Sequence, residues 1–84
     1  NNSAMDGFAV KAVDAGKTLS VKEVVYAGDV QAASLCDGEC YKIMTGAQVP
    51  PDADTVIPIE NVVKFENKEV TLPEILSLGY AVRL

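Results

Sequence analysis

The first stretch of the sequence that could do chemistry runs from Asn2 to Ala9, where Asp6 stands directly before Gly7. Gly7 allows the chain to turn sharply, and the apolar residues on both sides would anchor that turn on a core. A carboxylate held there can accept hydrogen bonds, orient water or bind a hard cation. Because Asp-Gly pairs are common in turns, the spacing alone favours an ordinary turn at the start of a strand.

A second stretch, residues 42–50, places Thr45, Gly46 and Ala47 at the end of an apolar run. A hydroxyl beside backbone amides that a glycine exposes can cradle a phosphate or another oxyanion. The stretch has neither the glycines and lysine of a phosphate-binding P-loop nor the paired glycines of a dinucleotide fold. A structural turn is therefore the default interpretation of these residues when they are taken by themselves.

The third stretch contains two carboxylates, Asp52 and Asp54, just before an apolar run that ends at Glu60. Two carboxylates two residues apart could share a magnesium ion, but they fall short of the ligand set of an EF-hand loop. Solvated loop charges are the favoured interpretation of this pair.

The chain has two cysteines, Cys36 and Cys40, and no histidine. A zinc site would need four Cys or His ligands, which the sequence does not supply, so the favoured interpretation of the pair is two reduced thiols beside a turn, with a local disulfide as the alternative. The absence of histidine also removes the Ser-His and Cys-His nucleophile pairs. Chemistry in this chain must therefore use carboxylates, hydroxyls, backbone amides or a borrowed metal.

The length and charge of the chain limit its class further. Eighty-four residues make one domain, which the first and last residues suggest was excised from a multidomain protein. A net charge of −5 argues against nucleic acid and anionic membranes as partners. Because the sequence shows neither an apolar run long enough to span a membrane nor a signal peptide, we expect a cytoplasmic protein.

The elements that must position these residues are predicted to be mostly β, because short β-rich runs alternate with Gly, Asp, Asn and Pro. Pro50-Pro51 predicts an extended loop, and Pro58 predicts an edge position or a bulge for its strand. Residues 30–34 are left open between a helical turn and an irregular crossing. The expected elements are strands over 7–13, 18–27, 41–44 and 55–59, a hairpin of 62–66 and 69–72 around Asn67-Lys68, and a helical turn within 73–78.

Taken together, two of the motifs resemble those of a known family. The first is N-S-A-M-D-G-F-A at residues 2–9, and the second is I-M-T-G-A-Q-V-P-P-D-A-D-T-V-I-P-I-E at residues 43–60. They are similar to motifs of the molybdenum cofactor biosynthesis family of bacterial MoeA and the E-domain of gephyrin. The ending L-G-Y-A-V-R-L resembles the lead-in to the next conserved segment of that family. The resemblance covers nearly the whole chain.

This resemblance implies a fold and an activity. The fold would be the mostly β domain near the N-terminus of these proteins, a compact arrangement of bent, bifurcated sheets (domain II-like) that fills residues 1–84. The activity would be that of a molybdopterin molybdotransferase, which with magnesium inserts molybdate into adenylylated molybdopterin and releases AMP. Members are cytoplasmic homodimers, and the molybdopterin-adenylylating protein of the same pathway is an implied partner.

The resemblance also implies roles for four residues. Asp6 and Thr45 match motif residues that face the active-site cleft, and they are the expected catalytic residues, with Asp6 also the expected magnesium ligand. Ser3 and Gly46 are the expected cofactor-binding residues at the same rim. The implied cleft has a second wall from the partner subunit, and because an acidic domain cannot hold anionic substrates alone, the isolated domain is expected to be inactive.

A competing hypothesis is a non-catalytic scaffold domain that binds a peptide by adding a strand to an exposed sheet edge. The two hypotheses differ in what they require, because the scaffold has no need of Asp6 or Thr45.

Overall fold

The computed structural model describes residues 2–3, 6–28, 34–74 and 82–83. Most of the ambiguous stretch at 30–34 and most of the helical turn expected within 73–78 lie outside the described residues. In chain order the elements are β1 (Asn2–Ser3), β2 (Gly7–Val10), the 3-10 helix η1 (Ala12–Asp14), β3 (Thr18–Val25), β4 (Glu39–Ile43), β5 (Thr55–Pro58), the 3-10 helix η2 (Ile59–Asn61), β6 (Lys64–Glu66), β7 (Glu69–Thr71) and β8 (Val82–Arg83).

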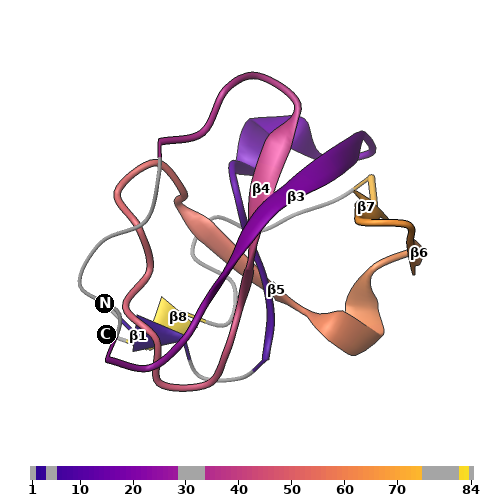
Figure 1. The fold of residues 1–84 in the computed structure, drawn as a ribbon. Helices are drawn as coiled ribbons and strands as arrows, with labels where there is room; N and C mark the ends of the chain where they lie inside the picture. Colours follow the sequence, from indigo (N-terminus) through magenta and orange to yellow (C-terminus); the bar gives the residue numbers. More distant parts are fainter. Residues whose placement is uncertain (1, 4–5, 29–33, 75–81, 84) are drawn as a thin grey trace.

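The strands form two sheets. The larger has six strands in the order β5-β2-β4-β3-β7-β6, and the smaller pairs β1 with β8. All neighbours are antiparallel except β3 and β4, which run parallel. Figure 1 shows β3 and β4 crossing the middle of the molecule, with β6 and β7 to one side. The expectation of a compact, mostly β fold of bent sheets is confirmed, and no helix in the described part of the chain is long and apolar enough to span a bilayer.

Strand alternation divides the apolar residues of the large sheet between its two faces. On β2, Phe8 and Val10 enter one buried cluster while Ala9 enters the other, and all three are fully buried. Apolar cover on both faces explains why every residue of β2 and β5 is buried. The first cluster comprises Phe8, Val10, Leu19, Cys40, Ile57, Val70 and Leu72, and the second Ala9, Val25, Tyr41, Ile43, Ala47, Ala53 and Val56.

Two predictions about local structure are wrong. The strand expected over 7–13 ends at Val10, because Asp54 Oδ1 accepts a hydrogen bond from the Ala12 amide (2.8 Å) at the start of η1. The loop expected to be extended at Pro50-Pro51 instead turns, with the Ala53 amide donating to the Pro50 carbonyl (3.0 Å). Proline at the second position of a β-turn is favoured by its fixed φ, which explains the turn.

Two other predictions are confirmed. Pro58 lies on β5, which is an edge strand of the six-stranded sheet. The β6–β7 hairpin turns through Asn67 and Lys68, whose φ values of 52° and 62° are those of a type I′ turn. The sequence signal was local in both cases, since it depended on the backbone preferences of one or two residues.

Candidate functional site

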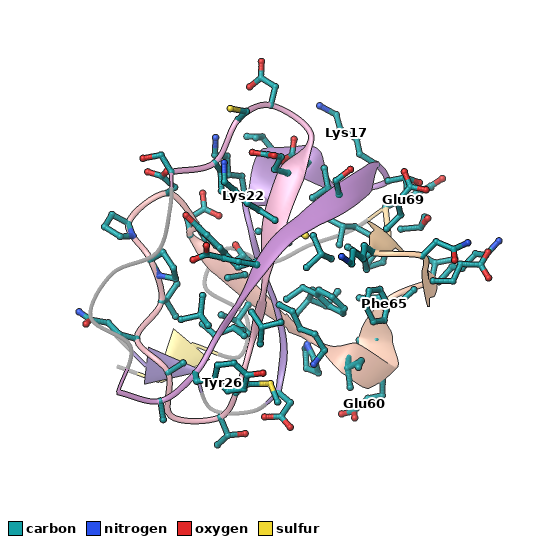
Figure 2. All side chains as sticks on the ribbon, in the orientation of Figure 1. Lys17, Lys22, Tyr26, Glu60, Phe65 and Glu69 are labelled. Atoms are coloured by element: carbon teal, nitrogen blue, oxygen red, sulfur yellow. The ribbon has the colours of Figure 1, made fainter. Side chains whose placement is uncertain are left out.

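The candidate site lies at the end of the large sheet where β2 begins and β4 finishes. Gly7 of β2 pairs with Ile43 of β4, which pairs in turn with Val25 of β3. One position further toward this end of the sheet, the chain has Asp6 before Gly7, Met44 after Ile43 and Tyr26 after Val25. Three segments that are distant in sequence thus meet at one end of these strands. Figure 2 shows Tyr26 at this end of β3 and Lys17 at the opposite end.

Asp6 and Thr45 are in direct contact at this end of the sheet. Asp6 Oδ1 accepts one hydrogen bond from the Thr45 backbone N–H (2.7 Å) and a second from the Thr45 hydroxyl (2.8 Å). Both residues are exposed. The two motifs that carry the family resemblance are therefore in contact at the protein surface, although Asp6 and Thr45 are 39 positions apart in the sequence.

The backbone around Asp6 is fixed by close packing of β2 against β5. The Ile59 amide donates to the Asp6 carbonyl (3.2 Å), which ties Asp6 to η2. At Gly7 a Cβ would overlap the Ile57 carbonyl oxygen and would lie 2.9 Å from its carbon. Glycine is therefore required beside Asp6 by the approach of the neighbouring strand and not by a turn, which differs from the sequence interpretation of an ordinary Asp-Gly turn.

Thr45 is held by a turn that follows β4. The Ala47 amide donates to the Met44 carbonyl (3.0 Å), and Gly46 at the third position has a φ of 84°. Positive φ at that position favours glycine, so the Thr-Gly pair is explained by turn chemistry. The turn aims both hydrogen-bond donors of Thr45 at Asp6, which leaves Asp6 Oδ2 without a hydrogen-bond partner in the described residues.

The hydrogen bonds stabilise the ionised form of Asp6. They lower the pKa of its carboxyl from the ordinary value of 3.8, the Thr45 backbone N–H contributing most and the Thr45 hydroxyl next. Partial desolvation acts in the opposite direction, and the positive charge of Lys42 lowers the pKa further. Asp6 is therefore a carboxylate throughout the neutral pH range, as a cation ligand or a water-orienting group must be.

Of the other expected site residues, Gly46 lies beside Thr45 in the turn described above. The backbone of Ser3 belongs to β1 and pairs with Val82, but its side chain lies outside what the structure describes. No cluster of three or more His, Cys, Asp or Glu side chains suited to a metal occurs among the described residues.

Asp52 and Asp54 have structural roles that the sequence interpretation of solvated loop charges missed. Asp52 Oδ2 accepts from the Leu35 amide (2.9 Å), and Asp54 Oδ1 accepts from the Ala12 amide and from the Thr55 hydroxyl (2.9 Å). The partners are 17 and 42 positions away in sequence, so no local pattern could have identified them. Each carboxylate fastens a separate loop to the body of the domain.

The two cysteines are free and differ in environment. Cys36 is exposed at the start of a turn, whereas Cys40 is fully buried in the first core cluster. Burial raises the pKa of the Cys40 thiol to about 12. Cys40 is therefore a small apolar core residue and not a nucleophile at neutral pH.

Comparison with known proteins gives a family match over almost the whole chain. Residues 1–83 match the family described as the MoeA N-terminal region (domain I and II). Among solved structures, the molybdopterin biosynthesis MoeA protein from Pyrococcus horikosii superimposes with a TM-score of 0.84 and 33% sequence identity, over 95% of this chain and 22% of that chain.

Relatives of known name are also similar to this chain. The molybdopterin molybdenumtransferase of Haemophilus influenzae is 38% identical over 77 residues, which are 89% of this chain and 19% of that protein. Molybdopterin molybdenumtransferase 2 of Mycobacterium tuberculosis is 42% identical over 67 residues, which are 71% of this chain and 16% of that protein. The chain thus spans less than a quarter of the length of each of these relatives.

Proposed function

This chain belongs to the MoeA N-terminal region family, and from that membership we propose that the protein carrying it is a molybdopterin molybdenumtransferase of molybdenum cofactor biosynthesis. The proposed reaction inserts molybdate into adenylylated molybdopterin and releases AMP. Support comes from relatives that bear this name and match most of the chain. The proposal extends to a cytoplasmic homodimer that receives its substrate from the adenylylating protein of the same pathway.

The observation that carries the proposal is the exposed contact between Asp6 and Thr45. Two motifs that are far apart in sequence meet there, with both donors of Thr45 directed at one carboxylate oxygen. A contact needed only for stability would gain more from burial, because exposed polar contacts contribute little to folding. The position at a strand end, supported by a packed sheet, suits a group that must be held still while it contacts a substrate.

The geometry suggests different roles for the two residues. Thr45 is a positioning residue, since its N–H and O–H both hold the Asp6 carboxylate in one orientation. Asp6 then presents Oδ2 outward, where it can orient water or a substrate group. Gly46 contributes the turn that gives Thr45 this direction.

Magnesium fits this site only in part. The described residues offer it one carboxylate oxygen, Asp6 Oδ2, and magnesium is commonly held by one or two carboxylates together with substrate phosphates and water. When bound, magnesium would neutralise phosphate charge. The remaining wall of the site, and most of its positive charge, would come from the partner subunit, because this chain carries a net charge of −5.

The proposed function is tested by rescue of molybdoenzyme activity in cells that lack molybdate insertion. The full-length protein should rescue, whereas Asp6→Asn should reduce rescue at least about tenfold, because the variant keeps the shape of the side chain and loses its charge. Thr45→Val should also fail, while Thr45→Ser, which retains both donors, should rescue. Asp37→Asn at an exposed turn is the matched control.

Expression and folding of each variant are checked by immunoblot and by circular dichroism. Full rescue by Asp6→Asn would contradict the proposal and favour a role that does not involve this carboxylate.

One observation favours the scaffold hypothesis as a second candidate. β6 is the edge strand at the far side of the large sheet, all three of its residues are exposed, and Val63 and Phe65 expose 68% and 39% of their surface. Figure 2 shows Phe65 on this side of the molecule, well away from Tyr26. Rescue by Asp6→Asn together with loss of rescue by Val63→Ser would favour this hypothesis, because Val63 is the more exposed of the two, whereas the Phe65 ring packs against the buried Phe8.

A further inference from the structure

Lys42 lies on the same face of the large sheet as Asp6. On β4 it pairs with Phe8 of β2 and with Val24 of β3. Extending the β2–β4 register by one position places Asp6 opposite Met44, so Asp6 and Lys42 are diagonal cross-strand neighbours. Such neighbours lie within reach of each other when one of the side chains is long. Lys42 is thus one of the residues that surround the candidate site.

The side chain of Lys42 extends toward the site. Its Nζ lies 3.7 Å from Met44 Sδ, and Met44 is the residue directly before Thr45. The stem therefore runs along β4 in the direction of the Thr45 turn. Its neighbour Val24 is 36% exposed, so this face remains open to solvent beside Lys42.

The ammonium group of Lys42 has no carboxylate partner within 4.0 Å among the described residues. Three other lysines do, since Lys17 pairs with Asp14, Lys22 with Glu39 and Lys64 with Glu66. The contact of Lys42 is with a thioether, which is a weak acceptor and can satisfy only one of three N–H donors. Lys42 is half-buried, and its charge lies beside the candidate site without an ion-pair partner among the described residues.

Thr45 cannot supply a hydrogen-bond donor to a substrate in this arrangement. Its N–H and O–H both donate to Asp6, so Thr45 cannot also donate to a phosphate or molybdate oxygen while that contact lasts. A carboxylate by itself repels an oxyanion. We propose that Lys42 binds an oxyanion group of the substrate beside Asp6, either a phosphate of the adenylylated pterin or molybdate. This inference rests on the proposed function and adds to it a specific anion-binding residue from the acidic domain.

The test is steady-state kinetics of molybdate insertion by the purified full-length protein, with adenylylated molybdopterin and molybdate varied separately. Lys42→Met keeps an apolar stem beside the cross-strand partner Phe8 and removes the charge. It should raise KM for one of the two substrates by about tenfold or more, as expected for the loss of one charge-assisted hydrogen bond, and should change kcat by less than about threefold. The substrate whose KM rises identifies which oxyanion Lys42 binds.

Two further variants separate charge from packing. Lys42→Arg retains the positive charge and should restore KM to within about threefold of the wild-type value. Lys22→Met removes a lysine that is already paired with Glu39, and it should leave both KM values unchanged. The KM affected by Lys42 should also rise with salt more steeply in the wild type than in Lys42→Met, because salt screens the lost interaction.

The outcomes distinguish this inference from the function on which it rests. Unchanged KM values in Lys42→Met, beside an inactive Asp6→Asn, would overturn the role of Lys42 and leave the proposed function standing. Failure of Lys42→Arg to restore KM would show that packing matters and not charge, which also overturns it. A wild-type protein without insertion activity would overturn both.

Discussion

Replacement of Gly7 by alanine tests whether the close approach of β5 to β2 holds Asp6 in place. An added Cβ would overlap the Ile57 carbonyl oxygen and would lie 3.1 Å from the Pro58 Cα. These are backbone atoms, so no flexible side chain can move aside, and the paired register of Gly7 with Pro58 and Phe8 with Ile57 must open instead. Overpacking of this kind costs about 1–3 kcal/mol of the free energy of unfolding.

The sign of the effect decides between two explanations of Gly7. The φ of Gly7 is not among the positive values in the structure. Without the clash, alanine would therefore stabilise the fold by about 0.4–1 kcal/mol, because it lowers the conformational entropy of the unfolded chain. With the clash we expect the overpacking cost to exceed this gain and leave a net loss of about 1–2 kcal/mol. Since 1 kcal/mol shifts Tm by about 4–8 °C in a domain of this size, Tm should fall by roughly 10 °C.

Thermal unfolding of the 84-residue chain, followed by circular dichroism, measures this loss. Gly38→Ala is the control, because Gly38 has a φ of 82° and nothing within 4 Å of its added Cβ, so it reports the cost of positive φ without a clash. That cost is about 1–2 kcal/mol. A Gly7→Ala variant as stable as the wild type, or more stable, would refute the proposed packing of β2 against β5.

Two further predictions concern titration and thiol reactivity. The Thr45 amide proton should shift with pH in NMR spectra, with a midpoint below the ordinary aspartate value of 3.8. Because the pKa of folded Asp6 is lowered, the contact is complete at neutral pH and is lost as pH falls through the folded-state pKa, so a midpoint above 3.8 would contradict the hydrogen bonding described. Iodoacetamide at neutral pH should alkylate Cys36 and spare Cys40 in the folded chain, because burial raises the pKa of Cys40 to about 12, whereas both should react in urea. Mass spectrometry that found Cys40 labelled as fast as Cys36 in the folded chain would show that this part of the core opens readily.

The features that could be predicted from sequence were those set by one or two residues. Asn67 and Lys68 tolerate positive φ between two apolar runs, which is sufficient to specify a hairpin. Pro58 cannot donate to a sheet ladder, which is sufficient to indicate an edge. The meeting of Asp6 with Thr45 was expected from the family resemblance alone, since nothing in the local spacing of either motif joins them.

The features that could not be predicted depend on contacts between distant segments. The parallel pairing of β3 with β4 has no local signal, because alternation of apolar residues does not specify the direction of a neighbour. The premature end of β2 depends on Asp54, which is 42 positions from its partner Ala12. The direction in which Thr45 donates was also hidden, because no local pattern shows that both of its donors contact the Asp6 carboxylate.

The strand order has a consequence for how the domain assembles in time. Only the β6–β7 pair of the large sheet is a hairpin between consecutive strands, and such hairpins form in microseconds. β2 must instead wait for β4 and β5, which are made later. A ribosome adding about 5–20 residues per second makes Thr45 roughly 2–8 s after Asp6, from which it is separated by 39 positions. During that interval Phe8 and Val10 have no strand to pair with, so the segment that carries the candidate carboxylate cannot join the sheet until β4 and β5 have been made.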